Sequence, residues 1–368
     1  MNGSLYIGLM SGTSLDGVDG VLSCISPDGH TKVLAHASAA FDPALRAPLL
    51  ELNRSGPDEL HRAALAADAL TRVYARVVQS LLDDTGHPPA DIVAVGAHGQ
   101  TVRHQPQHQP AYTLQLGAPA LLAELTGIDV VADFRSRDVA AGGQGAPLVP
   151  AFHLGAFGQP GRCRAVLNIG GIANLSVLPG DGHAVGWDCG PGNALIDHWC
   201  QLHLDAPFAR DGAWAAGGKV HPALLTSLLS EPYLHQPPPK STGRDLFHPD
   251  WLQVHLNRHA ASPVDVQATL TAYTATCCAL DVRHHAPLAE TLIVCGGGAL
   301  NHSLMRALQQ ELPGVEVVGS QTLGLPPLQV EAAAFAWLAF KFVQRQPASL
   351  PGVTGAQGAR VLGALYPR

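Results

Sequence analysis

Two strand–turn–strand patterns, one in each half of the chain, restrict the folds that this sequence can adopt. In the first, an apolar run at 5–10 breaks at 11–14 and resumes at 16–22. In the second, the segment 166–178 has two apolar runs joined by a glycine turn. Apolar runs bounded by short glycine-rich turns predict buried strands in hairpins. Their repetition predicts an internally duplicated fold.

The remaining pattern alternates strands with helices. We predict strands at 31–39, 92–95, 112–116 and 129–132, and helices that begin at Ser55 and that span 262–279 and 330–342. A chain of 368 residues is longer than one compact core usually holds, so two lobes with a ligand cleft between them are expected. The sequence therefore predicts an α/β protein with two lobes.

Charge and composition exclude several classes of protein. The formal net charge is −7, and no dense Lys/Arg run is present, so a polyphosphate backbone would be repelled and nucleic acid is not an expected partner. The N-terminus lacks the pattern of a signal peptide, and no apolar run approaches the length that spans a bilayer. The seven cysteines form no CxxC pair, which favours reduced thiols. We expect a cytoplasmic protein with no membrane partner.

Three glycine-rich turns follow three apolar strands, at 11–14, at 170–171 and at 296–298. Glycines let backbone N–H groups approach phosphate oxygens, and Ser and Thr hydroxyls add donors. The nearby carboxylates of Asp16 and Asp19 suit a hydrated magnesium ion. One such loop alone would be interpreted as an ordinary turn, whereas three in one chain favour nucleotide binding.

Two common nucleotide-binding folds fit poorly. The P-loop pattern GxxxxGK[ST] is absent, and Asn301 occupies the position of the last glycine in the dinucleotide-binding pattern. The fold that remains is the actin-like ATPase and sugar-kinase fold, in which two duplicated lobes bind ATP.

Seven motifs carry a closer resemblance. They are GLMSGTSLDGVD (8–19), GAHGQTVRH (96–104), DFRSRDVAAGGQGAPLVP (133–150), NIGGIANLS (168–176), DCGPGNALID (188–197), PPKSTGRDLF (238–247) and EAAAFAWLA (331–339). In this order, and over the whole chain, the sequence resembles the anhydro-N-acetylmuramic acid kinase family. The resemblance implies a two-lobed actin-like ATPase fold, which is a duplicated ribonuclease H-like fold, with ATP and sugar in the interlobe cleft. The expected lobes are 1–135 with about 346–368, and 136–345.

The same resemblance implies a reaction. Using ATP, magnesium and water, the family opens the 1,6-anhydro ring of anhydro-N-acetylmuramic acid and phosphorylates O6 in the recycling of bacterial cell-wall sugars. The implied nucleotide-binding residues are Gly12, Thr13, Ser14, Leu15, Asp16, Gly17, Val18, Asp19, Asn168, Gly170, Gly171, Gly296, Gly297 and Gly298, with Asp16 and Asp19 as magnesium ligands. A homodimer is the expected assembly.

Asp188 corresponds to the family's catalytic base. Water is a poor nucleophile at an anomeric carbon, so a carboxylate that takes its proton suits this chemistry. From the residues alone, a cap for a helix that starts near Asn193 is an equally good interpretation, because Asp often precedes a helix in this role.

Glu331, at the start of an apolar helix, is the second implied catalytic residue, and the alternative is an acid that the helix dipole favours in the first turn. His98, Asp133 and Arg135 suit the hydroxyls and the lactyl carboxylate of the sugar, although a structural ion pair would give the same residues. The full set of expected substrate-binding residues is His98, Asp133, Arg135, Gly190, Pro191, Gly192 and Asn193. Leu328 departs from the family's pattern, which has Asp there.

Two other functions stay open on the residues. One is a nucleotide-gated binding protein of the actin or chaperone kind, although no additional client-binding segment is recognisable after the two lobes. The other is a kinase that phosphorylates a related amino sugar without opening a ring.

Overall fold

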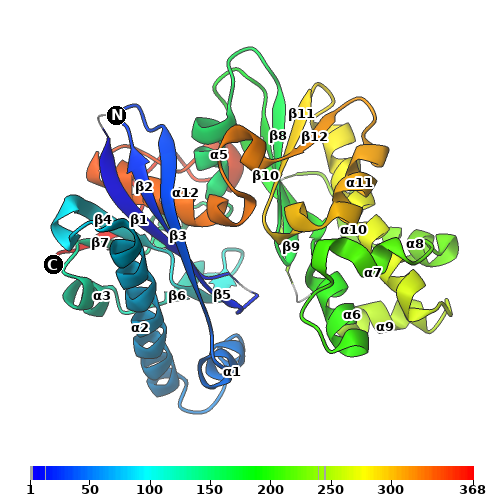
Figure 1. Ribbon diagram of the computed structural model, residues 1–368, viewed down its shortest axis with the longest axis horizontal. Coiled ribbons are helices and arrows are strands. Elements are labelled where there is room, and N and C mark those ends of the chain that lie inside the picture. Colours follow the sequence, from blue (N-terminus) through cyan, green and yellow to red (C-terminus); the bar gives the residue numbers. More distant parts are fainter. Residues whose placement is uncertain (1–2, 13, 239, 244–245) are drawn as a thin grey trace. The chain divides into compact units, whose positions relative to one another are not determined.

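The computed structural model describes residues 3–12, 14–238, 240–243 and 246–368. The chain forms two compact units, of which the first comprises Met1–Ala156 with Gln329–Arg368 and the second Phe157–Leu328. Figure 1 shows both units. In the described part of the chain, no helix combines the length and the apolar character needed to cross a membrane.

The first unit is built on a six-stranded mixed sheet. Its strands are β1 (Ser4–Met10), β2 (Gly17–Ile25), β3 (Thr31–Ala40), β4 (Ile92–Ala97), β7 (Val130–Ala132) and β13 (Ala364–Tyr366), in the order β13-β7-β4-β1-β2-β3. The first three strands pair antiparallel, and β4 and β7 continue the sheet parallel to β1. The predicted opening hairpin and third strand are confirmed.

Helices cover both faces of this sheet. The elements are α1 (Pro43–Glu51), α2 (Glu59–Thr85), α3 (Pro119–Thr126), α4 (Ser136–Ala140), α5 (Val149–Phe157), α12 (Val330–Val343), α13 (Pro351–Thr354) and a separate hairpin of β5 (Gln100–Gln105) and β6 (Tyr112–Leu116). Helix α2 packs on the face that carries Ile7 and Leu9 of β1. Helix α12 packs on the opposite face, and ten of its residues are buried. A helix that is apolar all round is one that is buried.

Two glycines allow α12 to lie directly against the strands. Gly8 of β1 and Gly96 of β4 are partners in the parallel ladder. A Cβ at Gly8 would lie 1.9 Å from the carbonyl oxygen of Ala332, and one at Gly96 would lie 2.0 Å from that of Phe335. Any side chain at these two positions would therefore collide with the helix backbone.

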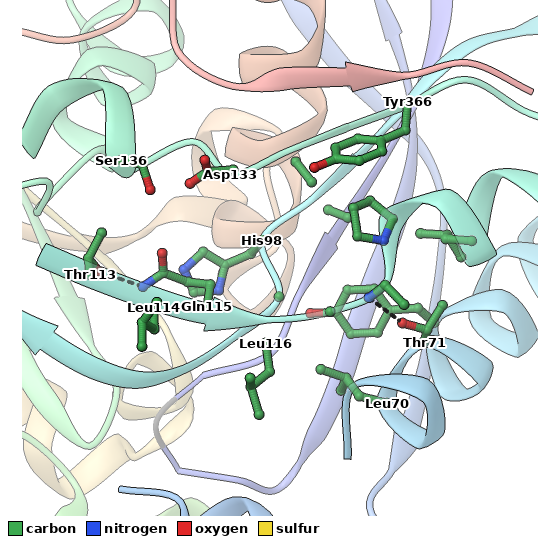
Figure 2. A pocket seen from close by; sticks show the side chains of 18 residues that line it. Leu70, Thr71, His98, Thr113, Leu114, Gln115, Leu116, Asp133, Ser136 and Tyr366 are labelled. Atoms are coloured by element: carbon green, nitrogen blue, oxygen red, sulfur yellow. Dashed lines mark hydrogen bonds between the residues drawn. The ribbon is translucent and has the colours of Figure 1, made fainter. Parts of the chain in front are cut away.

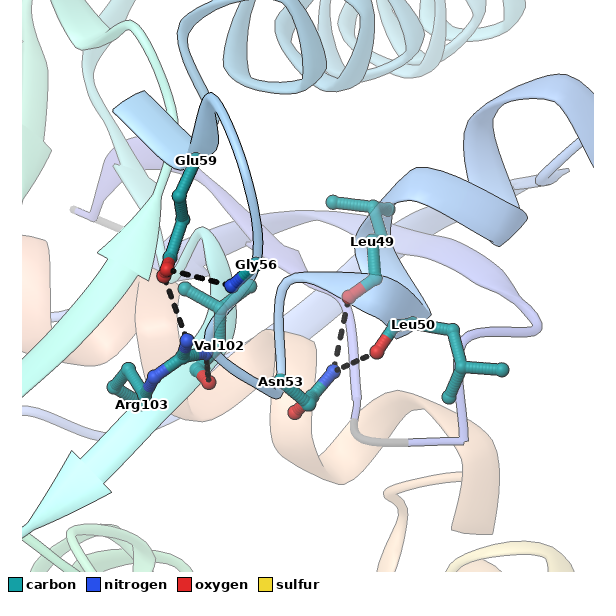
Figure 3. A network of polar contacts seen from close by, with 7 residues as sticks. All are labelled: Leu49, Leu50, Asn53, Gly56, Glu59, Val102 and Arg103. Atoms are coloured by element: carbon teal, nitrogen blue, oxygen red, sulfur yellow. Dashed lines mark hydrogen bonds and ion pairs between the residues drawn. The ribbon is translucent and has the colours of Figure 1, made fainter. Parts of the chain in front are cut away.

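Helix α2 begins at Glu59, so the prediction that it begins at Ser55 is wrong. Asp58 has a left-handed backbone conformation (φ 51°), which a right-handed helix does not accommodate. The Glu59 carboxylate accepts a hydrogen bond from Arg103 of β5 at 2.6 Å and one from the backbone N–H of Gly56 at 3.4 Å (Figure 3). These contacts hold the helix start against the β5–β6 hairpin.

The second unit repeats the arrangement of the first. Its strands are β8 (Arg164–Ile169), β9 (Ile172–Leu178), β10 (Val185–Pro191), β11 (Thr291–Cys295) and β12 (Glu316–Gly319), in the order β10-β9-β8-β11-β12. Strands β8, β9 and β10 pair antiparallel, and β11 and β12 follow parallel to β8. Strand for strand, this is the order and direction of β3-β2-β1-β4-β7. The predicted duplicated, actin-like fold is confirmed.

Helix α10 joins two cores of the second unit. The helices here are α6 (Ala194–Leu204), α7 (Ala213–Ala216), α8 (Pro222–Leu229), α9 (Pro249–Leu256), α10 (Pro263–His285) and α11 (His302–Glu311), with short 3-10 turns at η3 (Pro232–His235), η4 (Gly297–Leu300) and η6 (Pro327–Gln329). One side of α10 packs on the sheet through Cys278 and Val282. Its other side packs on α6, α8 and α9 through Leu270 and Tyr273.

The borders of the compact units differ from those of the expected lobes. The expected borders lie near 135 and 345, whereas the units divide after Ala156 and after Leu328. The first unit includes α12 because that helix packs on β1 and β4. It includes most of α5 because Phe152 of α5 packs on Trp337 of α12, with ring centroids 6.1 Å apart.

Candidate active site

The opening loop of the first unit is fixed at its start by buried hydrogen bonds. Ser11 Oγ donates to the carbonyl of Gly99 at 3.1 Å and lies 2.8 Å from the hydroxyl of Tyr74. The amide of Gln100 donates to the carbonyl of Gly12 at 3.0 Å, and Leu15 N–H donates to the same carbonyl at 3.2 Å. The loop is thus tied to the segment that follows β4.

The predicted nucleotide-binding residues of this loop differ in which of their atoms a ligand could reach. The side chains of Leu15 and Val18 lie in the hydrophobic core, so only their backbone atoms are available to a ligand. Gly12, Ser14 and Gly17 are partly exposed. Thr13, which the sequence also predicts for this site, lies outside the described residues.

The two expected magnesium ligands lie at the start of β2. Asp16 is exposed, and Oδ1 of Asp19 lies 3.2 Å from Nε2 of His36. Among the described residues, no group of three or more His, Cys, Asp or Glu could hold a metal ion. Magnesium usually keeps water and phosphate oxygens and takes only one or two carboxylates, so the chemistry of this pair fits magnesium that arrives with a nucleotide.

His98 and Arg135 form a partly buried contact at the carboxyl end of β4. The Nε and Nη2 atoms of Arg135 lie 3.0 and 2.9 Å from Nε2 of His98. Because guanidinium nitrogens only donate, Nε2 carries the lone pair, and we assign the ring proton to Nδ1. Burial and the charge of Arg135 hold the pKa of His98 well below its ordinary value, so the ring is neutral at neutral pH.

Arg135 has a second hydrogen-bond partner and is also influenced by nearby carboxylates. Its Nη1 donates to the carbonyl of Gly145 at 2.8 Å. Burial lowers the pKa of Arg135 to about 10, while the charges of Glu331 and Asp138 act in the opposite direction. The guanidinium is therefore still protonated at neutral pH, and all of these partners belong to the first unit.

Glu331 lies at the start of helix α12. Glu331 is the second residue of the helix and is partly buried. One turn further on, Phe335 packs on the ring of His98, with centroids 4.7 Å apart. Leu328, three residues before Glu331, is 45% exposed.

A cavity of about 260 Å³ lies in the first unit next to His98. Figure 2 shows His98, Gln115, Asp133 and Tyr366 among the side chains that line it. Asp133 is exposed and has a left-handed backbone (φ 57°), a conformation that often marks a functional position in a non-glycine residue. Gln115 and Tyr366 were not expected from the sequence, and Tyr366 reaches this site because β13 pairs with β7.

Asp188 lies on β10 of the second unit and is held by three hydrogen bonds. Its Oδ2 accepts the backbone N–H of Thr242 at 3.0 Å, its own N–H donates to the carbonyl of Lys240 at 3.2 Å, and its carbonyl accepts the hydroxyl of Tyr233 at 2.8 Å. The residue before α6 is Asn193, so Asp188 does not cap that helix.

Burial has the largest effect on the pKa of the Asp188 carboxyl. It raises the pKa of the carboxyl from 3.8 to about 6, whereas the Thr242 N–H and the charge of Lys240 act to lower it. A carboxylate with a pKa close to the working pH is suited to act as a general base.

The glycine turns of the second unit meet one another. Gly192 N–H donates to the carbonyl of Gly171 at 2.9 Å, and Asn193 N–H to that of Gly170 at 2.8 Å. A Cβ at Gly296 (φ 76°) would lie 2.4 Å from Oδ1 of Asn168, a buried atom with no partner in the part of the chain that is described.

These contacts group the expected residues by unit. The second unit brings together Asn168, Gly170, Gly171, Gly190, Pro191, Gly192, Asn193, Gly296, Gly297 and Gly298, although the sequence assigns some to nucleotide and some to sugar. His98, Asp133, Arg135 and Glu331 belong to the first unit.

Comparison with known proteins decides the family. A sequence model described as anhydro-N-acetylmuramic acid kinase matches residues 4–368. The chain belongs to the anhydro-N-acetylmuramic acid kinase family. The resemblance seen in the seven motifs is thereby confirmed.

Individual members of the family are similar over their whole length. The anhydro-N-acetylmuramic acid kinase of Variovorax paradoxus is 60% identical, with 100% of both chains covered. Those of Albidiferax ferrireducens and Chromobacterium violaceum are 59% and 54% identical, with 99% of each chain covered. Among solved structures, the activator of the 2-hydroxyisocaproyl-CoA dehydratase from Clostridium difficile with bound ADPNP has a TM-score of 0.45 and 15% identity, over 92% of this chain and 96% of that chain.

Proposed function

We propose that this chain is an ATP-dependent kinase that hydrolyses the 1,6-anhydro ring of anhydro-N-acetylmuramic acid and phosphorylates O6. The product is N-acetylmuramic acid 6-phosphate, and the setting is the recycling of peptidoglycan sugars in the cytoplasm. The observation that carries this proposal is the family match over residues 4–368. The surroundings of Asp188 support it.

In the first step, Asp188 acts as the general base. A water molecule attacks C1 of the sugar and gives a proton to the Asp188 carboxylate, while the C1–O6 bond breaks and its electron pair stays on O6. The Thr242 N–H holds Oδ2 at 3.0 Å, so the other carboxylate oxygen is the one that faces the water. Glu331 assists ring opening.

In the second step, O6 attacks the γ-phosphorus of ATP and ADP leaves. The backbone N–H groups of the loop 12–19 and of the glycine turns at 170–171 and 296–298 bind phosphate oxygens. Magnesium, held by Asp16 and Asp19 together with the phosphates, supplies positive charge when it is bound.

The sugar is bound in part by the first unit. His98, Asp133 and Arg135 bind its hydroxyls and lactyl carboxylate, with Gly190, Pro191, Gly192 and Asn193 as further contacts. The cavity of about 260 Å³ beside Asp133 receives one of the sugar's substituents. Its mixed lining, with polar groups on Gln115 and Asp133 and apolar walls, is typical of small-molecule sites. The homodimer that the resemblance implies stays a prediction.

The proposed reaction predicts that ATP consumption requires the sugar. With anhydro-N-acetylmuramic acid present, ADP should form in equal amount to the sugar phosphate, and without it ADP formation should fall to background. In ¹⁸O-labelled water, mass spectrometry should find the label at C1 of the product, because ring opening adds solvent oxygen there. Sugar-independent ATP hydrolysis would favour the nucleotide-gated binding protein, and an unlabelled C1 would favour a kinase without ring opening.

The ionisation of Asp188 predicts the pH dependence of the reaction. Only the ionised carboxylate accepts a proton from water, so kcat/KM should be level above pH about 6 and fall about tenfold for each unit below it. The measurement is a profile of kcat/KM at saturating ATP and magnesium. An acid limb near pH ~4, the value for an ordinary Asp, would contradict the assignment.

A further inference from the structure

Lys240 and Asp281 form a buried ion pair in the second unit. Nζ of Lys240 lies 3.2 Å from Oδ1 of Asp281, and the two side chains are 2% and 5% exposed. Lysine and aspartate are rarely buried so fully. Because the loss of hydration of two buried charges offsets much of their attraction, such a pair contributes little net stability compared with an apolar pair. Its position beside Asp188 offers another role.

The pair connects three segments that are distant in sequence. Nζ of Lys240 also donates to the carbonyl of Leu234 in η3 at 3.2 Å, and it lies 5.3 Å from the ring centroid of Tyr233. Oδ2 of Asp281, on α10, accepts the indole N–H of Trp187 at 2.8 Å. Trp187 directly precedes Asp188 on β10. The pair therefore anchors the segment 240–242 and β10 to the same helix.

Both anchored parts hold Asp188. The segment 240–242 receives the Asp188 N–H at the Lys240 carbonyl and donates the Thr242 N–H to the Asp188 carboxylate. Tyr233, whose ring lies under the Lys240 ammonium, donates its hydroxyl to the Asp188 carbonyl. A shift of the segment 240–242 would remove the one backbone donor described for this carboxylate.

We infer that Lys240 and Asp281 are positioning residues for Asp188, because their ion pair fixes the segment 240–242 so that the Thr242 N–H orients the Asp188 carboxylate. This inference rests on the proposed role of Asp188 as the base. Among the described residues, the charge of Lys240 acts on Asp188, and the charges of Cys189 and Asp281 act with that of Asp188 on the neighbouring Tyr233. Among them Lys240 carries the positive charge, so its removal disfavours the ionised carboxylate.

A purely structural role for the pair makes a different prediction. Removal of one partner leaves an uncompensated buried charge, which destabilises the fold whatever the function of the pair is. Removal of both charges relieves this penalty. If the pair only stabilised the fold, the double variant Lys240→Met with Asp281→Asn would recover activity together with stability.

The test compares Lys240→Met, Asp281→Asn and the double variant in the full chain. The control is Arg283→Met, which removes an exposed ion pair with Glu311 from the same helix α10. Thermal unfolding should show a loss for the single variants and recovery in the double variant. The kcat/KM of the double variant should nevertheless be at least about tenfold below that of the wild type, with its acid limb displaced to higher pH. Arg283→Met should leave both unchanged.

A second measurement does not depend on turnover. The pKa of the Asp188 carboxyl, followed by ¹³C NMR, should be higher in the double variant than in the wild type. A double variant with the wild-type pH profile and wild-type kcat/KM would overturn the inference and leave the role of Asp188 intact. If Asp188→Asn itself kept turnover, both the inference and the proposed role of Asp188 would fall.

Discussion

Asp188→Asn is expected to fold and to lose roughly 10²–10⁴-fold in kcat, the usual cost of removing a general base. Asparagine has nearly the same shape as aspartate, and its amide oxygen can still accept the Thr242 N–H that now binds Oδ2 at 3.0 Å. It cannot take a proton from water. Steady-state kinetics with ATP and anhydro-N-acetylmuramic acid would measure the loss.

The same variant should be more stable than the wild type at neutral pH. The carboxyl has a pKa of 3.8 as a free group and about 6 in the folded chain, so the folded state binds the proton more tightly. The tighter binding of the proton stabilises the folded state below pH ~4, and this stabilisation is lost as pH rises through about 6. The variant has no such loss, so its Tm should exceed that of the wild type near pH ~8, and the difference should shrink near pH ~5.

An exposed aspartate provides the control for both measurements. Asp250→Asn, in the first turn of α9, changes the same chemical group on the surface of the second unit. It should leave kcat and the pH dependence of Tm unchanged. Near-normal turnover in Asp188→Asn, with Asp250→Asn as reference, would remove Asp188 from the mechanism.

Gly8→Ala is expected to destabilise the first unit strongly. The new Cβ would lie 1.9 Å from the Ala332 carbonyl oxygen and 2.5 Å from the Ala336 nitrogen, and both are backbone atoms that cannot change rotamer. Helix α12 must therefore move off the sheet. Overpacking of this kind costs about 1–3 kcal/mol, and occasionally more, in the free energy of unfolding. Urea denaturation would measure it.

A matched glycine separates steric collision from the general effect of the substitution. Gly352, in α13 of the same unit, has open space where its Cβ would lie. Gly352→Ala should be neutral or stabilising by about 0.4–1 kcal/mol, because it restricts the unfolded chain. Equal effects of the two substitutions would show that α12 does not depend on Gly8 for its contact.

The fold was predictable where the pattern is local. Apolar runs with glycine turns located β1, β2, β8 and β9, and their repetition predicted the duplication that the two sheets show over five strands each. The start of α2 was not predictable in this way. The sequence before it has the acids and the proline that are typical of a helix start, and it does not reveal the left-handed backbone of Asp58. The extent of the first compact unit differs from that of the expected lobe because it depends on the packing of α12.

The candidate site was predictable only in part, for a similar reason. Asp188, Glu331 and the opening loop were expected from the family's motifs. The partners of Asp188 were not, because Thr242 is 54 residues away in sequence and the Trp187–Asp281 bond spans 94 residues. Contacts between residues so far apart in sequence cannot be predicted from a short motif. Tyr366 likewise reaches the cavity only through the pairing of the last strand with β7.

The absence of side chains at Gly8 and Gly96 also restricts internal motion in the first unit. Where backbone meets backbone, no rotamer change can take up a displacement, and a close-packed interior resists compression. The loop after β1, His98 after β4, and Glu331 at the head of α12 are attached to these three elements. They should therefore move together as a single rigid block, and a ligand that displaces one of them carries the other two with it.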